Sequence, residues 1–217
     1  CFSRLGDIAG MGDKYFGNVG VTLGALDLDV PVACTSMEAI DPRFKAMEQC
    51  WAEPGGPYYE AIYTAIKNRL RYVINHNNGD KGVTQFMDIL DRVMKEDPSM
   101  DLEYMRSRRF TSDHCPFYPT QEQMPRMKKF NMQFSCGAHE LSSDHGYSIG
   151  KIYSESYANR VGPIGSLMKN GIMASNEGGG DGMDDVNITT FRRWFPYIDR
   201  KRSDGATLAK EEAINRV

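Results

Sequence analysis

The sequence predicts an α/β fold built around a parallel sheet. From residue 57 onward, segments with the 3.6-residue period of amphipathic helices alternate with short apolar segments typical of buried strands. With 217 residues and 41% hydrophobic content, the chain is long enough to bury a sizeable core. Such alternation is typical of a parallel sheet with crossover helices, arranged either as an open doubly wound sheet or as a barrel.

The first two helices have the clearest pattern. Residues 57–70 open with a proline, which suits the first position of a helix, and their apolar side chains recur on one face. Residues 81–97 repeat this pattern through side chains that include Phe86 and Leu90, and Pro98 marks the helix end. Each helix leads into a short apolar segment. The strands predicted from these segments are residues 71–76 and 108–115.

The later helices are shorter. A helix over residues 120–131 begins with Thr120 and Gln123 at the spacing of a capping box. Gly171 closes the helix predicted over residues 162–171, because glycine readily adopts the left-handed conformation that ends helices. The strands that follow these two helices are residues 132–139 and 172–175.

The two ends of the chain are less regular. Residues 12–25 suggest a strand with a glycine-rich loop, and residues 41–57 suggest a helix or an ordered loop. Two more helices are expected towards the C-terminus, over residues 187–195 and 207–217.

Charge and hydropathy exclude several classes of partner. The formal net charge is −3, with 26 basic and 29 acidic residues mixed along the chain, so no basic field exists to hold a nucleic acid or an anionic membrane. The most apolar stretch, residues 19–33, is interrupted by Asp27 and Asp29, so no membrane-spanning helix is predicted. We therefore expect neither a nucleic-acid nor a membrane partner, and a small, roughly neutral molecule as the substrate.

The spacing of the cysteines bears on the cellular compartment. They are scattered and form no C-x-x-C pair, so neither a zinc knuckle nor a redox dithiol is predicted. A reducing cytoplasm is the simplest interpretation, and we expect a cytoplasmic protein. The first residue is Cys rather than Met, so the chain is expected to start inside a longer protein. The five cysteines are Cys1, Cys34, Cys50, Cys115 and Cys136.

Three histidines follow predicted strands. His76, His114 and His139 each lie at the C-terminal end of such a segment. In a parallel sheet these ends share one edge, where catalytic loops gather. Each histidine alone is more often structural than catalytic, but three in equivalent places favour a metal or proton-transfer site.

The glycine-rich segment at residues 171–185 fits no common ligand loop. It lacks the Lys-Ser/Thr of a phosphate-binding loop and the alternating oxygen ligands of a calcium loop. A nucleophile elbow G-x-S-x-G is also absent from the sequence. The open possibilities for this segment are a linker or the mouth of an active site.

The ordered set of strand-end motifs resembles the amidohydrolase superfamily of metal-dependent hydrolases, in particular the branch that contains N-substituted formamide deformylase. The matching motifs are HNNGD at 76–80, SDHC at 112–115, GAH at 137–139, NRVGPIGSLMKNGI at 159–172 and TLAKEEAINRV at 207–217. The resemblance covers about residue 70 to residue 217 and is faint before it. The resemblance lies in the ordered set of motifs.

The resemblance implies a TIM-like (β/α)8 barrel, of which this chain would supply roughly strands 4 to 8 as one partial domain over residues 1–217. The family's strand-one His-x-His pair has no counterpart in the sequence. The resemblance therefore implies a longer protein, whose N-terminal part carries this pair and a small β-sandwich. A homo-oligomer is a further possibility, which does not depend on the resemblance.

The resemblance also implies the residues of a metal site. His76 and His114 would bind a divalent metal, with zinc as the expected ion, and Lys14 would match a lysine that can be carbamylated and bridge metals. His139 would steady the substrate, and Arg160 would bind an anionic substrate group. The reaction expected is hydrolysis of a carbon–nitrogen bond in a small amide-type substrate.

One position departs from the family pattern. The family's strand-eight Asp, which accepts the proton of the attacking water, is Asn176 here. An amide has no basic site for this proton, so three explanations stay open: Glu177 takes the role, Asp181 takes it from the loop, or hydrolysis is lost and the protein only binds a ligand. Glu177 is slightly favoured because it directly follows the strand.

Overall fold

A computed structural model gives the structure of the chain over most of its middle part. The described residues are 11–13, 15, 20–22, 25–27, 32–74, 76–114, 120–136, 149–153 and 163–176. The two predicted C-terminal helices lie outside this range. Among the helices in the described ranges, none is both long and apolar enough to cross a membrane.

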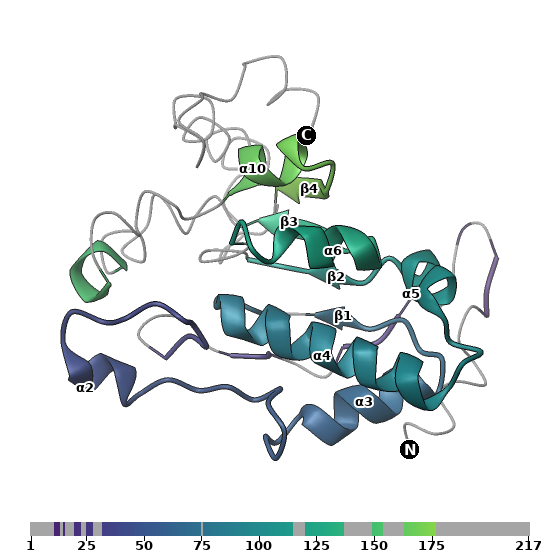
Figure 1. The fold of residues 1–217 in the computed structure, drawn as a ribbon, viewed down its shortest axis with the longest axis horizontal. Coiled ribbons are helices and arrows are strands. Elements are labelled where there is room, and N and C mark those ends of the chain that lie inside the picture. The colour runs from purple at the N-terminus through teal and green to yellow at the C-terminus, as the bar shows by residue number, and fades with distance from the viewer. Residues whose placement is uncertain are drawn as a thin grey trace.

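At least one helix precedes every strand of the described chain, as the sequence predicts (Figure 1). The four predicted helix–strand pairs are all present, although most elements are shorter than predicted. The elements are α2 (Pro42–Lys45), α3 (Tyr59–Lys67), β1 (Val73–Ile74), α4 (Asp80–Glu96), α5 (Leu102–Arg108), β2 (Thr111–Ser112), α6 (Met124–Phe130), β3 (Gln133–Cys136), α10 (Ile164–Lys169) and β4 (Met173–Asn176).

The strands form one parallel sheet in chain order, β1-β2-β3-β4. An isolated parallel bridge between Val21 and Tyr72 extends the sheet beyond β1, in the segment where the sequence suggests a strand. A doubly wound sheet reverses its strand order at a switch point, whereas this described sheet has no such reversal. The structure is therefore a mixed α/β fold with a four-stranded parallel sheet, and closure of that sheet into a barrel stays a prediction.

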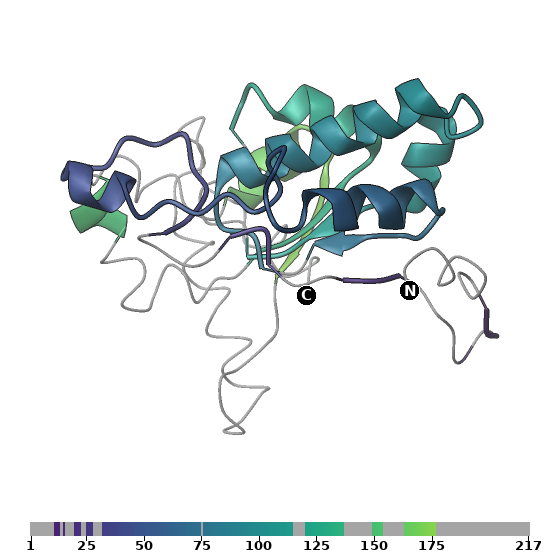
Figure 2. The ribbon, with the colours of Figure 1, turned by 90° about the horizontal axis from the view of Figure 1, so that it is seen from below.

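The helices lie in a layer against one face of the sheet. In Figure 2 the blue and teal helices α3 to α6 lie on one side of the strands. Alternate strand residues point into this helical layer, so Ile74, Phe134 and Cys136 are completely or almost completely buried. Tyr72 and Phe86 stack at 5.7 Å between ring centroids, and Phe86 meets Phe110 edge-on at 5.5 Å. The core thus fixes the strands from the helical side.

The turn from helix into strand has the same backbone conformation four times. One residue with positive φ ends α3, α5, α6 and α10 and directs the chain back into the sheet; these residues are Arg69 (66°), Arg109 (47°), Asn131 (55°) and Gly171 (70°). Gly171 confirms the helix end predicted from sequence. The other three are not glycines, so the positions of glycine in the sequence could not predict these three helix ends.

Helix α5 was not predicted from the sequence. α5 lies between α4 and β2 and begins at Asp101, whose side chain accepts a hydrogen bond from the backbone N–H of Tyr104 at 2.8 Å. Aspartate is one of the preferred N-cap residues. The signal was therefore present in the sequence, in a segment otherwise too short to show helical periodicity.

Candidate metal centre at the strand ends

The structure brings His76 and His114 together at one edge of the sheet. Ile74 pairs with Ser112 in the parallel ladder between β1 and β2. Each histidine lies two residues beyond its member of this pair, so the two occupy equivalent places on neighbouring strands. Their ring centroids are 4.6 Å apart, with the planes at 82°. The two imidazoles are close enough to serve one bound ion.

Both histidines have the left-handed backbone conformation, with φ of 62° at His76 and 64° at His114. For an L-residue other than glycine this conformation costs about 1–2 kcal/mol. Strain of this kind is concentrated at functional sites, where the surrounding structure enforces it. If the strands continued in extended form, His76 and His114 would point to the same buried face of the sheet as Ile74 and Ser112. The change of backbone conformation instead leaves both histidines half-buried at the strand ends.

Contacts with neighbouring segments fix the backbone and the ring of His76. Its backbone N–H donates to the carboxylate of Asp113, and its carbonyl accepts from the N–H of Leu26 at 3.0 Å. Ring Nδ1 lies 3.0 Å from the carbonyl oxygen of Asp27 and 3.4 Å from the side-chain nitrogen of Asn78. His76 is therefore held from β2 and from the segment before β1.

Asp27 is a buried carboxylate beside this histidine. Its side chain accepts three backbone hydrogen bonds, from Cys34 at 2.9 Å, from Asn78 at 2.8 Å and from Gly79 at 2.8 Å. Burial raises the pKa of the Asp27 carboxyl to about 7, although the hydrogen bonds from these three donors act in the opposite direction. Asp27 thus joins its own segment to Cys34 and to residues 78–79.

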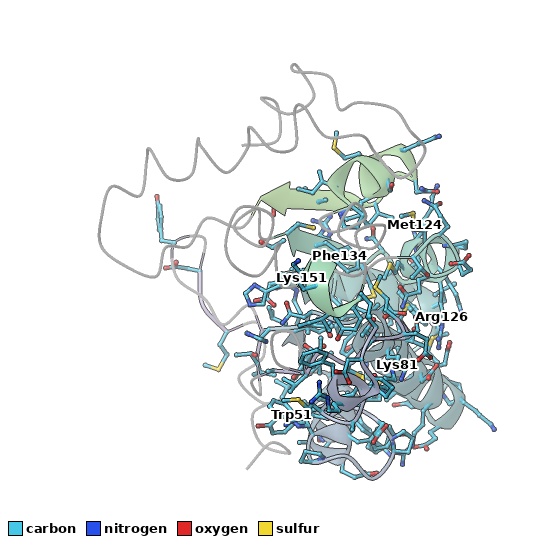
Figure 3. All side chains as sticks on the ribbon, turned by 90° about the vertical axis from the view of Figure 1, so that its left-hand side faces the viewer. Trp51, Lys81, Met124, Arg126, Phe134 and Lys151 are labelled. Carbon is cyan, nitrogen blue, oxygen red and sulfur yellow. A yellow bond between two sulfur atoms is a disulfide. The ribbon has the colours of Figure 1, made fainter. Side chains whose placement is uncertain are left out.

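The HNNGD motif continues from His76 into the start of α4, where Asp80 has a fastening role. The Asp80 carboxylate accepts from the Thr35 hydroxyl at 2.6 Å, from the Ser36 N–H at 2.8 Å and from the Ser36 hydroxyl. Lys81 N–H donates to the carbonyl of Cys34 at 3.1 Å. Residues 32–37 are thereby tied across the N-terminal end of α4, next to the histidines. Figure 3, viewed from the left of Figure 1, labels Lys81 of α4 below Phe134 of β3.

A second group of potential metal ligands is already committed to other partners. Cys34, Glu48 and Cys50 have ligand atoms within 4.8 Å of one another, but the two cysteines form a disulfide with each other. Glu48 is neutralised by Lys81 at 2.9 Å and Lys45 at 3.0 Å. This group therefore has a structural role, because it links residue 34 to residue 50 and Glu48 to Lys45 and Lys81.

The disulfide corrects the interpretation of the cysteines. The sequence predicts reduced, scattered thiols, because cysteines 16 positions apart show no recognisable motif. In the fold, Cys34 and Cys50 meet, and Cys136 is also disulfide-bonded. Disulfides persist mainly in oxidising compartments. The cytoplasmic location therefore stays a prediction, without support from the cysteines.

The remaining predicted site residues are placed only in part. Asn176 is the last residue of β4, and its Cα pairs with that of Cys136 in the ladder. It therefore lies at the same edge of the sheet as the two histidines. The predicted residues outside the described ranges are Lys14, His139, Arg160, Glu177 and Asp181.

Sequence reasoning missed Asp27 as a member of this site. The residue interrupts the most apolar stretch of the chain, which served only to exclude a membrane span. An ionisable residue within such a stretch is rarely buried without partners. This is the signal that could have identified it, although the identity of its partners depends on the tertiary structure.

Comparison with known proteins gives similarity of fold. No family model and no curated protein matches the chain. An uncharacterized metal-dependent hydrolase from Pyrococcus furiosus is similar in structure, with a TM-score of 0.70 and 16% identity over 99% of this chain and 42% of that one. A second uncharacterized metal-dependent hydrolase, from Pyrococcus horikoshii OT3, has a TM-score of 0.64 and 17% identity over 99% of this chain and 39% of that one. The chain spans about two fifths of each.

Proposed function

We propose that the chain is part of a metal-dependent hydrolase in which His76 and His114 bind a divalent metal ion. The observation that carries this proposal is the convergence of the two rings, 4.6 Å apart, at the C-terminal ends of adjacent parallel strands. Active sites of parallel α/β folds lie at this edge. The two similar structures, both named metal-dependent hydrolases, support the same class.

The donor set fits a metal ion of intermediate softness. Neutral imidazole is a good ligand for zinc, and we propose zinc as the bound ion. A hydrogen bond to the second ring nitrogen normally orients a histidine ligand, and the Asp27 carbonyl makes such a contact with the His76 ring. The Asp113 carboxylate holds the backbone N–H of His76. When bound, the ion would lower the pKa of a water molecule and polarise the scissile carbonyl group.

The finer proposal is hydrolysis of a carbon–nitrogen bond in a small amide-type substrate, on a (β/α)8 barrel of the amidohydrolase type. It rests on the resemblance of the strand-end motifs together with the strand order. In it, His139 steadies the substrate, Arg160 binds an anionic substrate group, and Lys14 contributes to the metal site. In this proposal the rest of a longer protein supplies the remaining barrel strands and the remaining metal ligands.

Proton transfer depends on the end of β4. Asn176 lies at the catalytic edge, but its amide has no site that accepts a proton. In the proposal Glu177, which follows β4 directly, accepts the proton of the attacking water and passes it to the leaving nitrogen, with Asp181 as the alternative. The second candidate function, ligand binding without hydrolysis, follows from Asn176 if neither carboxylate takes this role.

Metal analysis of the full-length protein tests the proposal. We expect bound zinc in the wild type, and we expect His76→Ala and His114→Ala each to weaken zinc binding by roughly 100-fold or more, because even the loss of a supporting residue costs about 10–100-fold. Competition with a chromophoric chelator measures this affinity. A screen of N-formyl and N-acyl compounds then separates a hydrolase, which releases amine, from a ligand-binding protein, which does not.

Glu48→Gln is the matched control, because it changes the other group of potential ligands without touching the histidines. Its zinc affinity should equal that of the wild type. Unchanged zinc binding after both histidine substitutions would refute the proposed metal centre.

A further inference from the structure

We propose that Asp27 is a positioning residue that fixes the tautomer of His76, with the proton on Nδ1, so that unprotonated Nε2 is the nitrogen that binds metal. This inference rests on the proposed function for its metal-binding part. It goes beyond that function by assigning a role to a residue outside the strand-end motifs and by choosing between the two ring nitrogens.

The first step concerns the proton on the ring. Nδ1 of His76 lies 3.0 Å from the backbone carbonyl oxygen of Asp27. A carbonyl oxygen can only accept a hydrogen bond, so Nδ1 must donate. In a neutral imidazole the other nitrogen, Nε2, then has no proton and can act as a metal ligand. The amide nitrogen of Asn78, itself a donor, favours the opposite tautomer, but it is more distant at 3.4 Å.

The second step concerns the carbonyl group that selects this tautomer. The carboxylate of Asp27 accepts from Asn78 and Gly79, which follow His76 in the chain, and from Cys34 on the opposite side. One residue thus holds the loop of His76 by its side chain and the ring of His76 by its carbonyl group. Movement of the loop relative to Asp27 would break both sets of contacts.

The third step concerns the environment of these bonds. Asp27 is fully buried, and so is Cys34, whose N–H is one of its three donors. A low local dielectric strengthens buried hydrogen bonds, and a buried donor or acceptor that loses its partner is costly. The disulfide between Cys34 and Cys50 anchors one donor from outside the histidine loop. The carbonyl of Asp27 therefore has a fixed position against which the ring is oriented.

Nuclear magnetic resonance of the metal-free, full-length protein tests the inference. Long-range ¹H–¹⁵N correlations of the His76 imidazole distinguish the Nδ1–H tautomer from the Nε2–H tautomer. We expect Nδ1–H in the wild type and a shift towards Nε2–H in Asp27→Asn and Asp27→Ser, whose side chains cannot accept all three backbone bonds. Zinc affinity should fall by about 10–100-fold in these variants, as for other residues that orient a metal ligand.

Asp80→Asn is the matched control. Asp80 is also a buried aspartate that fastens residues 32–37, through Thr35 and Ser36. Its substitution should lower the unfolding temperature without changing the tautomer of His76. A purely structural role of Asp27 would give the same result as this control.

The Nε2–H tautomer in the wild type would overturn the inference, even if the variants fail to fold. An unchanged tautomer in a folded Asp27→Asn protein would overturn it as well. A tautomer that shifts as expected, in a protein that binds no zinc, would support the positioning role and refute the proposed metal centre. Failure of the two proposals is therefore distinguishable.

Discussion

Single residues with unusual backbone geometry mark both ends of the strands. Arg69, Arg109 and Asn131 have positive φ before β1, β2 and β3, where the chain leaves a helix. His76 and His114 have positive φ after β1 and β2, where no helix end requires it. The first group is explained by helix termination. The second group has no such local cause, which is why it points to a site.

Gly79 shows how closely the segments around the histidines are packed. A Cβ atom at this position would lie 1.8 Å from the carbonyl oxygen of Cys34, a backbone atom that cannot move aside alone. We therefore expect Gly79→Ala to destabilise the protein by about 3 kcal/mol or more, because overpacking forces the backbone to shift. Unfolding in urea measures the change.

Gly55→Ala provides the comparison for this prediction. Gly55 has φ of 86° and nothing within 4 Å of its would-be Cβ atom, so only backbone strain opposes the substitution. Its cost should be about 1–2 kcal/mol. Equal losses in the two variants would show that close packing against Cys34 is not the reason for glycine at position 79.

At the scale of elements, arginines from one element stabilise the end of another. The guanidinium group of Arg71 donates to the carbonyls of Arg108 and Arg109 at 2.8 Å, at the end of α5. Arg106 donates to the carbonyls of Lys128 and Lys129 near the end of α6, at 2.9 and 2.8 Å. The last carbonyls of a helix have no partner within it, so these contacts satisfy them. Arg71 and Arg106 thus supply the hydrogen bonds that the C-terminal carbonyls of α5 and α6 lack.

Glu96 links α4 to α3 and makes their packing sensitive to acid. The Tyr63 hydroxyl, then Arg92 and Lys67, lower the pKa of the Glu96 carboxyl from its ordinary value of 4.5 to about 2. A lowered pKa stabilises the fold above the unfolded value and loses this effect as the pH falls through the folded one. We expect the midpoint of urea unfolding to fall between about pH 4.5 and about pH 2 partly for this reason.

Two variants isolate this contribution. Glu96→Gln should flatten the pH dependence in this range, because the amide does not titrate. Tyr63→Phe should remove the largest cause of the shift while leaving the carboxylate in place. If the slope of the wild type persists in both, acid sensitivity arises from other groups.

At the scale of the whole molecule, one parallel sheet with a helical layer on one face unites segments far apart in the sequence. Residues 149–153 pack against residues 33–44 in a second small core made by Ala33, Met37, Ile149, Ile152 and Tyr153, and they lie beside α2 in Figure 1. This core lies at the side of the molecule where the strands end. It supports the segment 32–37 from outside.

The disulfide between Cys34 and Cys50 stabilises that same region as a whole. Closing a loop of this length removes conformational freedom from the unfolded chain worth about 3 kcal/mol. The double variant Cys34→Ser/Cys50→Ser should lose about this much free energy of unfolding in urea. Alkylation of the wild type without reductant, followed by mass analysis, checks that the pair is oxidised. Equal stability of the double variant would refute the contribution.

The fold was predictable from sequence where the pattern is local. Helix periodicity, Pro98 and Gly171 give the positions of α4 and α10 to within a few residues, because these signals depend on near neighbours. α5 was missed because its main signal is a single capping aspartate. β1, β2 and β3 are shorter than predicted because strand ends depend on pairing with other strands, which the sequence alone does not specify.

The candidate site was also predictable only where it depends on local sequence. The sequence by itself determined that histidines follow two successive strands, since that depends only on chain order. Only the tertiary structure decided that the two rings meet, that Asp27 holds one of them, and that Cys34 pairs with Cys50. These contacts join residues brought together by sheet register and core packing, and no local pattern in the sequence encodes such distances.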